Sequence, residues 1–478
     1  MQKQRELIVL VKPEAGLRKV REGFVSVTKT EVSSFANFSK MQGVTITPLF
    51  GSEDRLKASA TRFKAETQKQ LPDLSIYYKV FAPDEQLDSL AKDIRKLDIV
   101  TAAYVKPAAE PPIFLKTMVT KAEEPPAATP DFTARQGYLE AAPTGVDAKY
   151  AWTQIGGRGA GVRIIDIEGA WRCTHEDLIL NHGGLIAGTQ STDIDWRNHG
   201  TAVNGEFGAA ENMFGINGIS PDSFARSISI FGETTGSAGA IQRAAEALSV
   251  GDIILIEQHR PGPRYNFEDV GEQKGYIPIE WWPDDFDAIK YATGRGVIVV
   301  EAGGNGAENL DDAIYDNPAQ GFPTDWTNPF NREHRDSGSI VVGAGNPPSG
   351  THGKTGNDIE TYVDRARCSF SNYGSIIDVQ GWGWEVTTIG YGDLQGGANE
   401  DYWYTDVFSG TSSASPIIVG SLACLQGILI AQGKSPMTTA QARSLLRSTG
   451  SPQQDAPGRP VSQRIGNRPD IKQLSSLI

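Results

Sequence analysis

The stretch Val162-Arg163-Ile164-Ile165-Asp166 places a short, mainly apolar run directly before an acidic residue. Similar apolar runs follow along the chain, at residues 228–231, 253–256, 297–300 and 340–342. Strands that are buried on both faces of a parallel sheet have this composition. Stretches with helical spacing lie between the runs, at residues 238–250 and 284–293. The alternation predicts an α/β domain with a doubly wound, mostly parallel sheet.

The first hundred residues have a different order of elements. We expect strands at residues 7–11, 44–49, 74–81 and 99–105, and helices at residues 33–40 and 85–96. The second helix is the clearer of the two, because Leu87, Leu90, Ala91 and Ile94 recur at helical spacing. The order βαββαβ predicts a small ferredoxin-like α+β domain at residues 1–106.

Residues 107–131 form a proline-rich linker between this small domain and a larger one at residues 132–478. Six prolines favour an extended, exposed chain here. A short apolar patch, Ile113-Phe114-Leu115, interrupts the linker. The linker is therefore either a plain spacer or a segment that lies in a cleft or is cut.

Composition narrows the classes of partner. The net charge of −13 favours solubility and argues against nucleic acid as a partner. Three cysteines, Cys173, Cys368 and Cys424, do not make a disulfide framework, and free thiols fit a reducing compartment. The apolar run at residues 7–11 is too short for a signal peptide. We expect a cytoplasmic protein as synthesised, with export by a non-standard route left open. The apolar stretch 416–430 predicts a buried core helix, so we expect no membrane partner.

Three segments carry residues suited to nucleophilic catalysis. Asp166 ends a predicted strand, His199 stands in Asn198-His199-Gly200-Thr201, and Ser412 stands in Ser409-Gly410-Thr411-Ser412-Ser413-Ala414-Ser415-Pro416. A serine hydroxyl needs a base to remove its proton, histidine can do this near neutral pH, and a carboxylate orients the histidine. The carboxyl ends of parallel strands are where such residues meet. We expect Asp166, His199 and Ser412 to form a catalytic triad.

The order Asp, His, Ser with these flanking patterns resembles the subtilisin-like serine proteases, the subtilase family. The resemblance extends from about residue 136 to the C-terminus, including the stretch at 464–469. It implies a serine endopeptidase that hydrolyses peptide bonds in proteins through an acyl-serine intermediate. It also implies an oxyanion role for Asn305, within Val299-Val300-Glu301-Ala302-Gly303-Gly304-Asn305-Gly306. The side-chain amide of Asn305 would then donate a hydrogen bond to the tetrahedral oxyanion.

The same resemblance implies a zymogen. Members of the family often carry an N-terminal prodomain of ferredoxin-like shape, and residues 1–106 resemble it in the order of their elements. This domain would act as an intramolecular inhibitor, and the linker after Val105 would pass near the active site and be cleaved. No organic cofactor is expected. Asp311, Asp312 and Asp316 form either a calcium site, which many members use, or a solvated acidic loop.

The chain also departs from the family's pattern. The family usually has a small residue and then glycine after the aspartate, whereas Ile167, Glu168 and Gly169 follow Asp166 here. Glu168 also suggests the related sedolisins, in which carboxylates replace the histidine, but His199 in its full motif argues against that alternative. Two other functions stay open: a transpeptidase or macrocyclase on the same fold, and a non-enzymatic peptide-binding protein.

Overall fold

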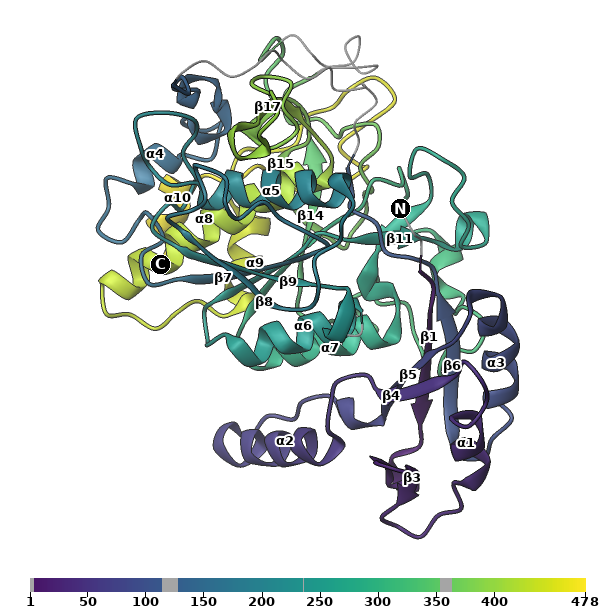
Figure 1. Ribbon diagram of the computed structural model, residues 1–478. Helices are drawn as coiled ribbons and strands as arrows, with labels where there is room; N and C mark the ends of the chain where they lie inside the picture. Colours follow the sequence, from purple (N-terminus) through teal and green to yellow (C-terminus); the bar gives the residue numbers. More distant parts are fainter. Residues whose placement is uncertain (1–3, 114–127, 235, 353–362) are drawn as a thin grey trace.

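The computed structural model describes residues 4–113, 128–234, 236–352 and 363–478 of the chain. A smaller N-terminal unit lies beside a larger unit built on a parallel sheet (Figure 1). The predicted fold class is confirmed, since the larger sheet is parallel with helices on both faces and the N-terminal unit is a small antiparallel α+β structure. The domain bounds themselves stay a prediction.

The larger sheet has seven strands in the order β15-β14-β13-β10-β7-β9-β8. Every neighbouring pair is parallel. The strands are β7 (Arg163–Glu168), β8 (His182–Ala187), β9 (Phe224–Ser229), β10 (Ile253–Ile256), β13 (Ile298–Ala302), β14 (Ile340–Gly345) and β15 (Ile377–Trp382). The central strand β10 is apolar and buried throughout, as expected for a strand covered on both faces.

Helices cover both faces of this sheet and make two hydrophobic cores. One core contains α4 (Ala148–Ala151), α5 (Ile194–Gly208), α8 (Thr411–Ala431), α9 (Thr439–Ser448) and α10 (Ile471–Ser475). The other contains α6 (Ser237–Ala247) and α7 (Pro283–Gly294). In the part of the chain that the structure describes, α8 alone is long and apolar enough to span a membrane, but 89% of its apolar window is buried. It is a core helix, as predicted.

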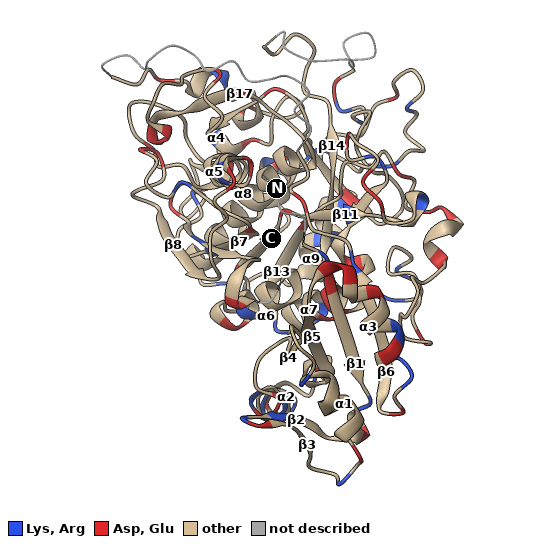
Figure 2. Cartoon of the chain, turned by 45° about the vertical axis from the view of Figure 1, so that its right-hand side comes forward, with Lys and Arg blue, Asp and Glu red and all other residues tan. Residues whose placement is uncertain are grey.

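The N-terminal unit is a four-stranded sheet in the order β4-β5-β1-β6, and its neighbours are antiparallel. Its strands and helices are β1 (Glu6–Val11), β2 (Leu17–Val20), β3 (Gly23–Ser26), α1 (Ser33–Phe38), β4 (Thr45–Pro48), α2 (Glu53–Thr67), β5 (Tyr77–Phe81), α3 (Leu87–Ile94) and β6 (Val100–Lys106). The β2–β3 hairpin and α2 were not predicted. Acidic and basic residues both occur along α2 (Figure 2), so its sequence has little apolar periodicity.

The two units share one continuous core. One face of the N-terminal sheet packs on α1 and α3, and the other face adds Ile8, Leu10, Tyr77 and Tyr104 to the core of α6 and α7. The contact between the two units therefore includes a continuous apolar core.

Buried ion pairs accompany this apolar contact. Lys106 Nζ at the end of β6 lies 2.5 Å from Asp284 Oδ2 and 2.9 Å from Asp285 Oδ2, at the start of α7. Glu6 on β1 lies 2.7 Å from Arg260 Nη2 of the larger unit. Burial alone would raise the pKa of Glu6, but the charges of the surrounding cations lower that pKa below its usual range. Both units therefore contribute charges to one buried network, which also includes Lys79 beside Glu6.

Two short antiparallel pairs lie beside the carboxyl ends of the main sheet. β11 (His259–Pro261) follows β10 and pairs with β12 (Tyr276–Pro278), and β16 (Val386–Ile389) pairs with β17 (Tyr404–Phe408). β11 and β17 lead directly to the residues of the site, since β17 ends just before the segment that contains Ser412.

Candidate active site

Strand β7 carries two acidic side chains toward helix α5. Asp166 and Glu168 are two residues apart on one strand, so both point to the same face of the sheet. Both are completely buried. The Nδ1 atom of His199 on α5 lies 2.6 Å from Oε2 of Glu168. The carboxylate of Glu168 is therefore the group that can orient the imidazole of His199.

The structure differs here from the sequence-based assignment, which paired His199 with Asp166. The Oδ2 atom of Asp166 accepts hydrogen bonds from Trp171 Nε1 at 2.6 Å and from Asn204 Nδ2 at 2.7 Å. The physical reason is the position of each residue along β7. Glu168 is the last residue of the strand, two residues nearer than Asp166 to its carboxyl end, and it is therefore the carboxylate that reaches His199 on α5. Glu168 is followed by two small residues, Gly169 and Ala170, and this pattern was a usable signal in the sequence.

Close packing of α5 sets the position of His199. A Cβ atom at Gly200 would overlap the carbonyl oxygen of Ala170 and come within 2.7 Å of the Trp171 ring. Glycine at this position lets the helix approach the chain that leaves β7. The imidazole also packs edge-on against Phe408, with the ring centroids 5.7 Å apart. Among the described residues, its Nε2 atom has no hydrogen-bond partner and is free to act as a base.

Burial without nearby cations controls the protonation of this region. It raises the pKa of Glu168 well above its usual value, and a hydrogen bond with Asp166 partly offsets the increase. It also raises the pKa of Asp166, and the charge of Glu168 raises it further. Burial lowers the pKa of His199 to about 3. The imidazole is therefore neutral over most of the pH range, as a general base requires.

Two more buried carboxyl groups belong to the same region and were not predicted. Glu257 follows β10, and its carboxyl accepts a hydrogen bond from Ser415 Oγ. Glu206 on α5 is also fully buried. Burial raises the pKa of both groups well above the usual value, and the charge of Glu257 raises that of Glu206 further. Their sequence context is ordinary, so only the fold shows that they lie together.

Ser412 is the second residue of α8, at the positive end of the helix dipole. The residue before the helix, Gly410, has φ of +118°, which favours glycine. A Cβ atom at Gly410 would overlap the carbonyl oxygen of Pro112 and lie 3.3 Å from Asn305 Nδ2. The hydroxyl of Ser412 donates a hydrogen bond of 2.7 Å to the same Pro112 oxygen. The nucleophile, the amide of Asn305 and a peptide carbonyl thus converge beside Gly410.

Asn305 is held with its amide directed toward this point. Its Oδ1 atom accepts hydrogen bonds from the backbone N–H of Thr411 at 2.9 Å and from the Thr411 hydroxyl at 3.0 Å. One N–H of its amide donates to Gln273 Oε1 at 3.1 Å. Nδ2 carries a second hydrogen for an oxyanion, so the predicted position of Asn305 suits the predicted role.

Part of the linker packs directly against these residues. Glu110 pairs with His259 in an antiparallel bridge, with both N–H to O distances at 3.1 Å. Ile113 forms an antiparallel bridge with Gly410. Residues 110–113 therefore lie across the nucleophile as an added strand, which is how many peptides are bound.

The three aspartates considered for calcium all have protein partners. Asp311 accepts hydrogen bonds from the backbone N–H and hydroxyl of Ser375, and Asp312 pairs with Arg264. Asp316 accepts from the amide of Asn328. Within the described ranges, no group of three or more His, Cys, Asp or Glu side chains has the arrangement of a metal site.

Comparison with known proteins gives a consistent set of relatives. A family model described as "Subtilase family" matches residues 181–467, a range that contains His199, Asn305 and Ser412 but begins after β7. Subtilisin BL of Lederbergia lenta is 24% identical over 297 residues, which are 61% of this chain and 84% of that protein. An alkaline protease of Alkalihalobacillus alcalophilus is 24% identical over 298 residues, 61% of this chain and 59% of that protein.

A solved structure has the same fold over the full length of both chains. The epidermin leader peptide processing serine protease of Staphylococcus aureus superposes with a TM-score of 0.54 at 15% sequence identity. The match covers 99% of this chain and 98% of that chain, so it includes the N-terminal unit as well as the larger sheet.

Proposed function

Because this chain belongs to the subtilase family of serine endopeptidases, we propose that it hydrolyses peptide bonds in proteins through an acyl-enzyme on Ser412. One observation carries the proposal. The Ser412 hydroxyl contacts a backbone carbonyl of a strand-paired segment, in a site that also contains a His–Glu pair and an amide donor. A nucleophile, a histidine with its carboxylate and an oxyanion donor are the groups that acyl transfer from a peptide uses.

The proposed triad is Ser412, His199 and Glu168. His199 takes the Ser412 proton on Nε2 and passes it to the leaving amine, while Glu168 fixes the Nδ1–H tautomer and stabilises the imidazolium. The Asn305 amide and the backbone N–H of Ser412 donate to the oxyanion. Removal of one such side-chain donor costs about 3 kcal/mol in subtilisin, the system in which the effect was calibrated.

We assign Asp166 a supporting role as a positioning residue. Asp166 Oδ1 and Glu168 Oε1 are both buried without a donor among the described residues. A proton held by Asp166 and shared with Glu168 satisfies both oxygens. It also leaves Glu168 as the ionised member of the pair, facing His199. The proposed role therefore moves from Asp166, the sequence-based choice, to Glu168, two residues along the same face of β7.

We propose that the chain is a zymogen and that its N-terminal unit acts as an intramolecular inhibitor. Residues 110–113 fill the cleft over Ser412, and the buried ion pairs of Lys106 and Glu6 hold the preceding strands against α6 and α7. A substrate cannot reach the nucleophile until this segment leaves. Cleavage of the linker would remove the covalent tether that keeps it there.

No step of this mechanism needs an organic cofactor or a metal ion. Protein groups already engage the carboxylates of Asp311, Asp312 and Asp316, so we propose that this loop is structural and does not bind calcium. The acyl-serine chemistry is supplied by side chains of the chain itself.

The test combines labelling, digestion and mass measurement. We expect a fluorophosphonate probe to label the wild-type chain at Ser412, casein to be digested, and the intact mass to show loss of the N-terminal unit. Ser412→Ala should show none of these, and Ser448→Ala, at an exposed serine of α9, should behave as wild type. A wild-type chain that takes no label and leaves casein intact after prolonged incubation would contradict the proposed function.

A further inference from the structure

The segment in the cleft has a distinctive sequence, Glu110-Pro111-Pro112-Ile113, and the contacts that hold it are specific to that sequence. We propose that the enzyme selects Glu-Pro-Pro in its substrates and cuts on the carboxyl side of the second proline. This inference rests on the proposed function, since it names the substrates of the same site. The polar contacts of each linker residue support it.

Glu110 is held both by its side chain and by its backbone. Its carboxylate Oε1 accepts a hydrogen bond of 2.8 Å from the hydroxyl of Tyr276, while its backbone N–H and carbonyl both pair with His259. Glu110 is 9% exposed, so this contact is shielded from water. A hydrogen bond to a buried carboxylate discriminates between substrates, because an apolar replacement leaves the Tyr276 hydroxyl with Asp269 as its remaining carboxylate neighbour.

Pro111 and Pro112 are held through their carbonyl oxygens. Proline has no backbone N–H, and these contacts do not need one. The carbonyl of Pro111 accepts from Gln273 Nε2 at 2.8 Å, and the carbonyl of Pro112 accepts from Ser412 Oγ at 2.7 Å. The backbone N–H that pairs with the cleft belongs to Glu110. The fixed φ of proline also reduces the conformational entropy that a peptide loses on binding.

His259 lies beside the linker segment that contains the bond to be cut. The buried ring of His259 stacks on Tyr276 with centroids 4.6 Å apart, and its Nδ1 accepts the backbone N–H of Asn305 at 3.3 Å. The imidazole is therefore held between the backbone bridge to Glu110 and the segment of Asn305. Pro111 and Pro112 are both buried, so a larger side chain at either position would have to displace its neighbours.

The chemistry of the step follows directly. Ser412 Oγ attacks the carbonyl carbon of the second proline, and its proton moves to His199 Nε2. The bond from that carbon to the next nitrogen then breaks, and the proton passes from His199 to the leaving amine. Water hydrolyses the acyl-enzyme and returns the Ser412 proton by the same route. In this chain the bond between Pro112 and Ile113 is the one presented.

The sequence contains the recognition element a second time. Glu-Pro-Pro occurs twice in the 478 residues, at 110–112 and again at 124–126, and both copies lie in the linker. The second copy lies outside the described residues, so it adds a sequence observation only. Cleavage after both copies would remove a short peptide between the two units.

Peptides that correspond to residues 108–115 of the chain test the proposal, with cleavage followed by mass spectrometry. We expect Ala-Ala-Glu-Pro-Pro-Ile-Phe-Leu to be cut between Pro and Ile, with kcat/KM at least about tenfold above that of the peptide with Ala in place of Glu. A peptide with Leu in place of the second Pro should also be cut more slowly. Intact mass of the wild-type chain should show its own cut after Pro112.

The variant Tyr276→Phe connects the preference to the structure. It should reduce the tenfold preference for Glu to about twofold or less, because the hydroxyl that reads the carboxylate is gone. Tyr402→Phe, at a tyrosine that is 39% exposed, is the matched control and should keep the full preference.

The outcomes separate this inference from the proposed function. If Ser412 takes the fluorophosphonate label and casein is digested, but the Glu and Ala peptides are cut equally or at other bonds, the Glu-Pro-Pro preference is wrong and the endopeptidase proposal stands. A preference that survives in Tyr276→Phe also overturns the argument. If the chain takes no label and cuts neither casein nor any peptide, both proposals fall.

Discussion

A carboxyl group that is fully buried keeps its charge only if a donor or a cation stabilises that charge. Glu168 has the imidazole of His199 and, in the proposed arrangement, the proton of Asp166. Asp166 in turn accepts two N–H groups on its other oxygen. Two acids on one strand face can therefore share a single negative charge, which is placed where the histidine needs it.

This division of roles makes the two acids respond differently to amide substitution. Glu168→Gln removes the charge behind His199 and should lower kcat by about 10³- to 10⁴-fold. Asp166→Asn keeps a donor in place of the shared proton, so it should lower kcat by less than about tenfold. Steady-state kinetics on one peptide substrate would measure both. Equal losses, or the larger loss at Asp166, would restore the aspartate as the partner of His199.

Glu206 gives a second prediction at the scale of one residue. Both of its carboxyl oxygens are buried without a donor among the described residues, and burial raises its pKa. The native chain therefore holds a proton here at pH values where the unfolded chain has lost it. The stability that this group contributes is present at low pH and is lost as pH rises above about 4.3, the ordinary value for glutamate.

Glu206→Gln removes this pH dependence. Its free energy of unfolding, relative to wild type, should increase by on the order of 1 kcal/mol or more between about pH 4 and about pH 8. Urea unfolding of Ser412→Ala backgrounds at the two pH values measures the difference without self-digestion. The exposed Glu66→Gln should show no such trend. A relative stability that falls with pH would mean that Glu206 is ionised in the native state.

At the scale of elements, the strands were predictable where burial on both faces makes them apolar. β10 was placed at its observed bounds, whereas the edge strand β8 was missed because it is polar, glycine-containing and only partly buried. The helix α2 was missed for a related reason, since its charged sequence buries only Glu53 and Leu56. Short motifs indicated His199 and Ser412. The choice between Asp166 and Glu168 as the partner of His199 depends on the position of each residue along β7, for which Gly169 and Ala170 after Glu168 were the usable signal.

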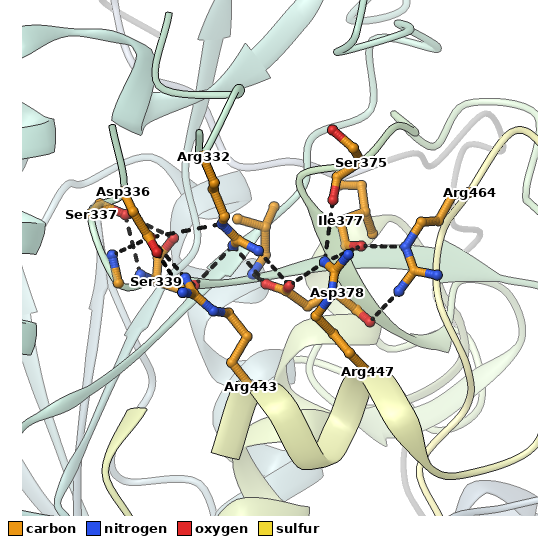
Figure 3. A network of polar contacts seen from close by, with 12 residues as sticks. Arg332, Asp336, Ser337, Ser339, Ser375, Ile377, Asp378, Arg443, Arg447 and Arg464 are labelled. Atoms are coloured by element: carbon orange, nitrogen blue, oxygen red, sulfur yellow. Dashed lines mark hydrogen bonds and ion pairs between the residues drawn. The ribbon is translucent and has the colours of Figure 1, made fainter. Parts of the chain in front are cut away.

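Helix α9 is fastened to the edge of the main sheet by an arginine cluster around one buried carboxylate (Figure 3). Asp378 on β15 is completely buried and lies 2.6 Å from Arg332 and 2.7 Å from Arg447. Its Oδ2 atom also accepts the backbone N–H of Val341 on β14. One carboxylate thus joins two strands, a loop and a helix.

Asp378→Asn should therefore destabilise the protein by about 3 kcal/mol, the lower end of the range for a buried ion pair, because the carboxylate is fully buried whereas the side chains of Arg332 and Arg447 are 18% and 35% exposed. Asp336→Asn is the matched control. Asp336 also pairs with Arg443 of α9, but its side chain is 35% exposed, so about 1 kcal/mol is expected. Urea unfolding of both variants in the Ser412→Ala background measures the two losses. Equal effects would show that burial of Asp378 does not decide the outcome.

At the scale of the whole molecule, the N-terminal unit and the main sheet should unfold together. They share an apolar core, and the chain crosses between them through a linker whose residues 110–113 are paired in the cleft. Buried charges of the two units also pair with each other, as Lys106 and Asp284 show. Independent folding of the two units would expose these groups and is therefore disfavoured.

Calorimetry of the Ser412→Ala chain, which cannot cut its linker, should show one cooperative transition. Lys106→Met in this background removes the nearest cation of Asp284 and Asp285 in a buried site and leaves Asp285 with Arg260 at 4.0 Å, which costs about 3 kcal/mol of docking free energy. We expect it to separate the trace into two transitions, the first at lower temperature. Lys96→Met, at an exposed pair with Asp93, should leave the single transition unchanged. Two transitions in the Ser412→Ala chain itself would mean that the units are independent, and the linker alone would then have to block the cleft.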